Sequence, residues 1–289
     1  MDSDGFSRCH PLTNFLFFLG AIGFAVVIQH PVYIAVSVIC GGIYYVLLKG
    51  RKGLGMIGGL VPVFLALAAV NPLFNQYGDH ILFTIFGRLY TLEALLYGMA
   101  IAGIFCAMLL WFSCYSIVIT SDKFVCLFGS LIPALSLLLV MVLRLIPNLM
   151  RKASQIAGAR RCVGKGAGEQ SAAKDKVLDG MNVLSALTDW ALEGSIVTAD
   201  SMRSRGYGAA KRTSFQIYRL SGLDGMLLAL EGLLAVAVIA AGGMGASFTP
   251  VLTIEQPGFG LVAYGLYLCI PILLELQEVL RWKIALSKI

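Results

Sequence analysis

Two arginines and a glycine stand close together in the stretch ADSMRSRGYG, residues 199–208, as Arg203, Arg205 and Gly206. A guanidinium group is planar and always charged, and it can hold a carboxylate through two parallel hydrogen bonds. Two such groups at one helix end predict a contact with an acidic partner. The same pattern is also typical of an ordinary helix end, because glycine adopts the left-handed cap conformation and cations favour the negative end of the helix dipole. The stretch alone leaves both interpretations open.

The composition indicates that these arginines belong to a protein of the lipid bilayer. Of the 289 residues 58% are hydrophobic and 13% are charged, whereas soluble domains average about 25% charged residues. A bilayer core needs about 20 apolar residues in a helix. Six runs are therefore predicted to span the membrane: 12–29, 31–48, 54–71, 94–119, 225–245 and 259–277. Most phenylalanine and tyrosine side chains are then expected to face lipid or the membrane interface.

The distribution of lysine and arginine predicts how these spans are oriented. Residues 144–219 hold 13 of the 22 basic residues but only six acidic ones. Because cytoplasmic loops are rich in lysine and arginine, this segment and both termini are predicted to lie in the cytoplasm. A seventh apolar run, 124–143, would place the basic segment outside if it crossed. It is therefore predicted to be a non-spanning helix, interrupted near Pro133.

The sequence thus predicts an all-α integral membrane protein with about six transmembrane helices and a cytoplasmic helical domain. The predicted segments are 1–120 with the first four spans, 121–219 in the cytoplasm, and 220–289 with the last two spans. Two helices are expected in the basic segment. Pro147 is predicted to open the first, which stops at Gly164, and the second carries apolar residues at helical spacing from Val177 to Met202 and ends at Arg205-Gly206.

Several long strings resemble the transmembrane T component of energy-coupling-factor transporters, the EcfT or CbiQ family. They are NPLFNQYG (71–78), WFSCYSIVITSDKFVCLFGSLIPALS (111–136) and ALEGSIVTADSMRSRGYG (191–208), and the resemblance runs from residue 6 to about residue 219. It implies a non-catalytic subunit in a bacterial cell membrane that links two ATP-binding-cassette ATPases to a substrate-binding membrane protein, the S component. The complex would import a vitamin or a metal. ATP and Mg²⁺ would be bound by the ATPases, and this chain would bind no cofactor.

In this family, two cytoplasmic helices each end in an Ala-Arg-Gly-like motif that docks in a groove of one ATPase. The resemblance implies that Ser204, Arg205 and Gly206 form the second motif, with serine in place of alanine and Arg203 beside it. The motif arginine is expected to meet an acidic residue of the ATPase.

The first motif corresponds to Cys162-Val163-Gly164, where the glycine is kept and the arginine is missing. Arg161 or Arg160 is expected to supply the charge, and the sequence leaves both alternatives open. The apolar run 124–143 must bury itself against a partner if it stays outside the bilayer. The resemblance makes the S component that partner, with candidate contacts at Pro133, Leu137, Leu138, Leu139 and Met141.

Other chemistry is not predicted. Gly158, Gly164 and Lys165 suggest a phosphate loop, but five residues separate the glycines instead of four, and Gly166 stands where serine or threonine would bind Mg²⁺. Seven cysteines without a CxxC and three scattered histidines predict no metal site. Glu231, near the predicted cytoplasmic end of its span, is expected to reach the interface or to form a local hydrogen bond.

Two further interpretations concern the whole chain. The cations of the basic segment are spaced along helices, so contact with lipid headgroups is expected and nucleic acid is not. The alternative function is a stand-alone membrane carrier or channel. That function would need polar residues at mid-membrane depth, whereas the charges of these spans lie near the span ends.

Overall fold

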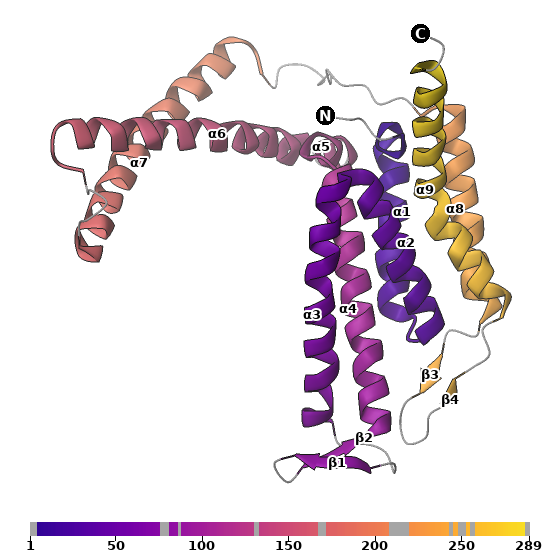
Figure 1. Ribbon diagram of the computed structural model, residues 1–289. Helices are drawn as coiled ribbons and strands as arrows, with labels where there is room; N and C mark the ends of the chain where they lie inside the picture. The colour runs from indigo at the N-terminus through magenta and orange to yellow at the C-terminus, as the bar shows by residue number, and fades with distance from the viewer. Residues whose placement is uncertain are drawn as a thin grey trace. The chain divides into compact units, whose positions relative to one another are not determined.

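The computed structural model describes residues 5–75, 81–85, 88–129, 133–166, 172–207, 220–242, 245–247, 253–254 and 258–286. Within these residues the chain forms nine α-helices, a short 3-10 helix (Phe6–Arg8) and two β-hairpins (Figure 1). The helices are α1 (Pro11–Val27), α2 (Pro31–Lys49), α3 (Arg51–Phe74), α4 (Leu92–Val118), α5 (Ser121–Gly129), α6 (Pro133–Cys162), α7 (Ala173–Ser204), α8 (Gly222–Ala241) and α9 (Phe259–Leu286). The predicted all-α fold is confirmed.

The two hairpins were not predicted. Strand β1 (Ile81–Ile85) pairs antiparallel with β2 (Arg88–Thr91), and β3 (Ala246–Ser247) pairs with β4 (Thr253–Ile254). Each hairpin joins two consecutive long helices, because β1 and β2 lie between α3 and α4, and β3 and β4 lie between α8 and α9.

The chain divides into two compact units. Residues 1–124 and 218–289 form the first, which we call the bundle, and residues 125–217 form the second, which we call the helix pair. Five helices of the bundle are long and apolar enough to cross a membrane: α2, α3, α4, α8, and α9 as far as Leu280. The apolar helix α1 has 17 residues, at the short end of the range of about 17–25 that can span a bilayer. The predicted multi-pass membrane protein is confirmed by these helices.

The turns of the bundle that carry lysine and arginine lie at one end of it. Successive helices alternate in direction, so the starts of α1, α5 and α8 share an end with the turn between α2 and α3 (Figure 1). Lys49, Arg51 and Lys52 stand at that turn, and Lys123 stands in the first turn of α5. The hairpins lie at the opposite end. The topology prediction requires this arrangement, but the side of the membrane that each end faces stays a prediction.

Two His-Pro dipeptides begin α1 and α2. His10 and His30 each accept, through Nδ1, a hydrogen bond of 3.2 Å from the backbone N–H two residues further on. An acceptor at this position satisfies a donor that the first helical turn leaves free. The proline that follows lacks an N–H and has a φ suited to the first turn. The two dipeptides therefore set where these helices start.

Aromatic side chains fill the centre of the bundle. The ring of Phe17 stacks on Tyr267 at 5.1 Å and meets Trp111 edge to face at 5.8 Å. The Trp111 indole N–H donates to Ser37 Oγ at 3.0 Å, so its polar edge is satisfied. The largest fully buried aromatic side chains are Phe6, Phe17, Phe18, Tyr33, Tyr44, Tyr45, Trp111, Tyr264 and Tyr267. Eight of these nine are phenylalanine or tyrosine, and they are exceptions to the expectation that most such side chains face lipid or the interface.

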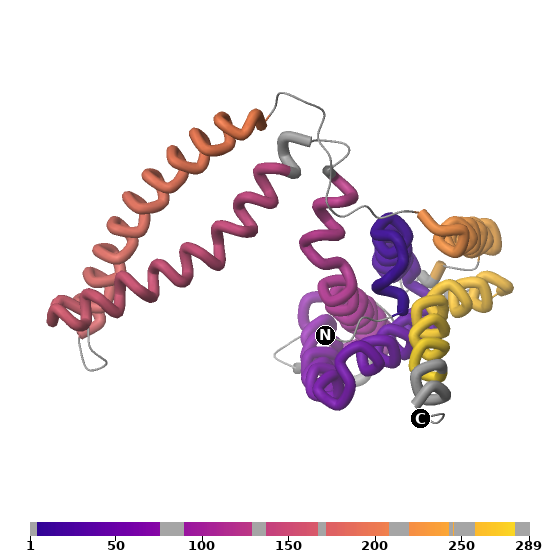
Figure 2. Tube along the Cα trace, turned by 90° about the horizontal axis from the view of Figure 1, so that it is seen from above, coloured from indigo at the N-terminus to yellow at the C-terminus, as the bar shows by residue number. Residues whose placement is uncertain are grey.

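In the helix pair, α6 and α7 run antiparallel and cross each other (Figure 2). Arg160 Nε lies 2.7 Å from Asp179 Oδ1, and the Lys152 ammonium lies over the Trp190 ring, 5.4 Å from its centre. These contacts join the two helices along their shared stretch.

The predicted start of the first cytoplasmic helix is wrong. The helix α6 begins at Pro133 and continues through Pro147. A proline inside a helix removes one backbone hydrogen bond, a loss that a helix of 30 residues accommodates. In the run 124–143, the described part of α5 ends at Gly129 and α6 begins at Pro133, so the predicted interruption near Pro133 falls beside residues that are not described and stays a prediction. Residues 130–132 lie outside the described part of the chain.

Glu231 contradicts its prediction. Its side chain is buried in α8, with the residue only 4% exposed. Neither carboxylate oxygen has a hydrogen-bond partner within the described residues. Glu231 therefore neither reaches the interface nor forms the expected local hydrogen bond.

Candidate functional site

The helix α7 ends in a cap closed by a left-handed residue. Gly206 has a φ of 74°, and its N–H donates to the Arg203 carbonyl at 3.1 Å. The next N–H, that of Tyr207, donates to the Met202 carbonyl at 3.1 Å. This pair of bonds is the Schellman motif, and its left-handed position strains any residue that has a Cβ. The predicted glycine cap at Gly206 is confirmed.

Two arginines lie next to this cap. Arg203 lies in the last turn of α7 and Arg205 is the C-cap residue, and both are exposed. Neither makes a hydrogen bond or ion pair through its side chain with any residue that the structure describes. Ser204 is also exposed, and its hydroxyl donates back to the Ser201 carbonyl at 2.9 Å. The capped helix end therefore fixes the backbone of the two arginines, and their side chains are available to another molecule.

The helix α6 ends in the same way. Gly164 has a φ of 72°, and its N–H donates to the Arg161 carbonyl at 3.0 Å. The Lys165 N–H donates to the Arg160 carbonyl at 2.9 Å, which completes a second Schellman motif. The sequence predicted that this helix stops at Gly164, and the structure confirms it.

Because the two caps have the same hydrogen bonds, their residues correspond one to one. The pairs are Gly164 and Gly206, Val163 and Arg205, Cys162 and Ser204, Arg161 and Arg203, and Arg160 and Met202. The largest chemical difference is at the C-cap, where Val163 is 72% exposed and carries no charge.

The structure distinguishes between the two arginines at the end of α6. Arg160 holds Asp179 through Nε at 2.7 Å, and its Nη2 donates to the Lys165 carbonyl at 3.3 Å. Its guanidinium is therefore occupied within the helix pair. Arg161 is exposed and, among the described residues, has no side-chain hydrogen bond or ion pair. Of the two, Arg161 is the one available to an external carboxylate.

The two caps are far apart. Arg160, near the end of α6, contacts Asp179, and from there α7 continues for roughly 25 residues to Ser204, or roughly 38 Å at the helical rise. Each cap can therefore meet a different partner molecule or a different member of a pair.

Apolar side chains are exposed along both helices of the pair. No residue of α7 is buried. The exposed large apolar residues of the described part of α6 are Leu138, Val140, Val142, Leu145, Ile146 and Met150, and those of α7 are Val177, Leu178, Met181, Leu184, Leu192, Ile196 and Val197. An exposed apolar surface of this size marks a contact with a partner or a membrane.

The residues predicted to contact an S component lie at the start of α6. Leu138 is 58% exposed, whereas Leu137, Leu139 and Met141 are half-buried. Pro133 is the first residue of α6, and its side chain lies outside the described residues. Whether these residues meet a partner stays a prediction.

The segment that suggested a phosphate loop is the end of α6. Gly158 lies within the helix. The N–H groups of Val163, Gly164 and Lys165 donate to α6 carbonyls at 3.2, 3.0 and 2.9 Å. A phosphate loop binds through such N–H groups, and here they are occupied.

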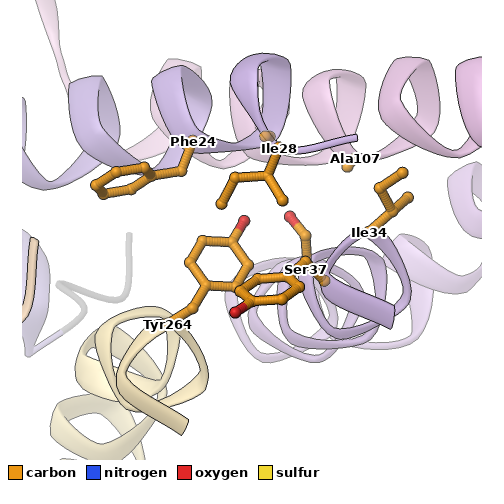
Figure 3. Close-up of a pocket in the computed structure, with 8 residues that line it drawn as sticks. Phe24, Ile28, Ile34, Ser37, Ala107 and Tyr264 are labelled. Atoms are coloured by element: carbon orange, nitrogen blue, oxygen red, sulfur yellow. The ribbon is translucent and has the colours of Figure 1, made fainter. Parts of the chain in front are cut away.

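Two other kinds of site concern the interior of the molecule, a metal site and a ligand pocket. Within the described residues, no group of three or more His, Cys, Asp or Glu side chains could hold a metal ion. A small pocket in the bundle is lined by residues of α1, α2, α4 and α9, and the hydroxyls of Ser37 and Tyr264 point toward one another beside it (Figure 3). This pocket has no room for a water molecule, so it is not a ligand site.

Comparison with known protein families gives a match to CbiQ, cobalt transport protein, over residues 6–215. No curated protein matches the chain. The family match covers well over half of the 289 residues, and it includes α1 to α7 and both glycine caps. The chain therefore belongs to the CbiQ family of cobalt transport proteins.

Proposed function

We propose that this chain is the coupling subunit, or T component, of an energy-coupling-factor importer. In this role it links two ATP-binding-cassette ATPases to a substrate-binding membrane protein, the S component. Membership of a transport family supports the role. The observation that carries the proposal is the presence of two glycine caps with the same hydrogen bonds, each presenting an exposed arginine that has no partner within the described residues.

Each cap docks on one ATPase. At the end of α7, Arg205 with Arg203 binds an acidic groove, beside Ser204 and Gly206. At the end of α6, Arg161 supplies the charge beside Gly164, because Arg160 is held by Asp179. A guanidinium group grips a carboxylate through two parallel hydrogen bonds, and losing one partner of such a buried pair costs about 2–5 kcal/mol. A contact of this strength on a closed helix end suits the transmission of force.

The exposed apolar surface of the helix pair receives the S component. Its contacts begin at Pro133 and include Leu137, Leu138, Leu139 and Met141. Residues 121–219 and both termini lie in the cytoplasm, and residues 1–120 and 220–289 span the bilayer. ATP and Mg²⁺ bind the ATPases and not this chain. The S component binds the transported vitamin or metal, so the cargo is not set by the residues described above.

Affinity purification of the chain from membranes in mild detergent tests this function. We expect two ATPase subunits and a small membrane protein to co-purify. The double variant Arg205→Ala with Arg161→Ala should insert normally, recover little ATPase and abolish uptake. Arg151→Ala is the matched control, because Arg151 is exposed on α6 away from the cap. Normal uptake by the double variant would refute the proposal. Uptake by the chain alone in liposomes without ATP would instead identify a stand-alone carrier.

A further inference from the structure

The segment Gly5–His10, which we call the N-terminal clasp, lies where the bundle is connected to the helix pair. The bundle ends at Phe124 and resumes at residue 218. The clasp contacts buried charged residues close to both of these points, and all of these residues belong to the bundle.

At the first connection the clasp holds Lys123, which is 5% exposed. The Lys123 ammonium donates to the Ser7 carbonyl at 2.5 Å and to Ser7 Oγ at 2.9 Å, as well as to the Val118 carbonyl at 2.9 Å. The Asn14 amide, oriented by the groups around it, donates to the Phe6 carbonyl at 3.0 Å and accepts from Lys123 at 3.2 Å. A buried ammonium is stable only where such acceptors replace water. The start of α5 is therefore tied to the clasp.

At the second connection the clasp holds Asp224, which is 6% exposed. Its Oδ1 accepts the backbone N–H of His10 at 2.9 Å. Its Oδ2 accepts the N–H of Ser221 at 2.9 Å and the hydroxyl of Ser221 at 2.8 Å, in a capping box that starts α8. One carboxylate thus joins the clasp to the first turn of α8.

The clasp is itself anchored in the bundle. Phe6 is fully buried, with its ring edge to face against Phe17 at 5.3 Å and Phe18 at 6.1 Å. The Gly5 N–H donates to Glu275 Oε2 of α9 at 3.0 Å. The segment is therefore fixed between α5, α8 and α9 and held by the aromatic core.

We propose that the clasp positions the two connections relative to each other, with Lys123 and Asp224 as the positioning residues. A displacement delivered through either connection then moves the bundle as one body, because separating α5 from α8 would leave a buried charge without its partners. The transport consequence rests on the proposed function, in which the helix pair receives the motion of the ATPases. The mechanical claim itself concerns only the bundle.

A distance measurement on the full chain in lipid nanodiscs tests the mechanical claim. Spin labels are placed at Asp122→Cys and Leu223→Cys, two exposed positions beside the connections, after the seven native cysteines are replaced. We expect Lys123→Met and Asp224→Asn to broaden the distance distribution by at least about twofold, as expected when a local unit opens. A label pair at Val70→Cys and Met99→Cys, exposed on α3 and α4, should keep its width.

The matched control is Arg8→Ala, because the Arg8–Glu278 ion pair belongs to the same segment but Arg8 is 57% exposed. This variant should leave the distribution unchanged. Ser7→Ala removes one hydrogen-bond acceptor of Lys123. If Lys123→Met does not fold, the width of the distance distribution in Ser7→Ala tests the clasp instead. An unchanged width in Ser7→Ala would then overturn the clasp, as an unchanged width in folded Lys123→Met would.

Transport gives the second readout. In the assembled importer, Lys123→Met should lower uptake per ATP hydrolysed by about tenfold, within the usual range of coupling between sites, while ATPase recovery stays normal. Lys123→Arg, which keeps the cation, should restore part of the uptake. A merely structural role would lower the amount of complex and not this ratio, so an unchanged ratio overturns the proposal. If wild-type chain recovers no ATPase, the proposed function fails, and the distance measurement still decides the clasp.

Discussion

The ends of α6 and α7 have the same backbone conformation and differ in the charge that they present. Both close with a glycine of positive φ and the same pair of hydrogen bonds. The end of α7 presents two exposed guanidinium groups without a partner among the described residues, Arg203 and Arg205. The end of α6 presents one such group, Arg161, because Arg160 is paired with Asp179. Glycine therefore sets the backbone shape of each helix end, and the neighbouring positions separately set the charge that the end presents.

The largest expected effect is that of Arg205→Glu. Reversing the charge at the C-cap should weaken ATPase binding by roughly 30-fold or more, as the loss of a charged pair of about 2 kcal/mol or more implies. Arg161→Glu should have a smaller effect if the α7 end carries more of the binding. Titration of purified ATPase onto the chain measures both, with Arg151→Glu as the control. Equal affinities for Arg205→Glu and wild type would contradict the comparison.

The next prediction makes the two ends alike. Val163→Arg places a guanidinium at the α6 position that corresponds to Arg205. Because the backbone is already the same, this variant should restore most of the uptake lost in Arg161→Ala. Uptake by the double variant, measured beside Arg161→Ala and Val163→Lys, checks this. Lysine should rescue less, since it cannot form a bidentate pair.

Substitution of the cap glycine should have the same effect on ATPase binding at the end of α6 and at the end of α7. Gly164→Val and Gly206→Val each force a β-branched residue into a left-handed conformation, at a cost of roughly 1–2 kcal/mol. Asparagine tolerates this conformation better, so Gly164→Asn and Gly206→Asn should retain more ATPase binding than the valine variants. A large loss at one glycine and none at the other would show that the two ends do not dock in the same way.

The smallest effect concerns cysteine alkylation. Cys162 is exposed at the α6 end and corresponds to Ser204. Maleimide should label Cys162 and the variant Ser204→Cys in the free chain, and bound ATPase should slow both reactions. If bound ATPase does not slow labelling at one of these positions, the helix end that carries it does not contact the ATPase.

Cys9, in the N-terminal clasp, is a half-buried cysteine whose rate of alkylation can be compared with that of exposed Cys162. Burial, helped by the charge of Asp224, raises the pKa of the Cys9 thiol from 9.0 to about 11. Only about one molecule in a thousand then carries the reactive thiolate at pH 8, so Cys9 should label slowly and accelerate as the pH rises toward 11. Fast labelling of Cys9 at pH 8, judged against Cys9→Ser, would show that the clasp is open.

Sequence reasoning predicted the helices of the bundle because hydropathy is a local property. All six apolar runs form helices, and α9 differs most from its prediction at its end, because it continues to Leu286, beyond the predicted residue 277. Hydropathy does not distinguish lipid from protein, so it missed the burial of Phe17, Trp111 and Tyr267. It also could not place Glu231, whose surroundings are set by packing between helices.

The candidate site was predictable where its signals are local. The sequence predicted that the first helix stops at Gly164, and glycine after a run of helical spacing predicted the cap at Gly206. The choice between Arg160 and Arg161 was not predictable, because it depends on Asp179 in the other helix. Pro147 misled the prediction of a helix start, since proline favours first turns and yet is tolerated inside a long helix. The clasp depends on contacts between residues more than 100 positions apart, such as Ser7 with Lys123.

A photo-crosslinking residue at Tyr207 tests directly whether the end of α7 docks on an ATPase. Tyr207 is exposed and its N–H closes the α7 cap, so a benzoylphenylalanine at this position leaves both arginines in place. On illumination of intact membranes, we expect an adduct with an ATP-binding-cassette ATPase that disappears in Arg205→Glu. Continued ATP-driven uptake with adducts only to lipid, or to proteins on the outer side of the membrane, would contradict it.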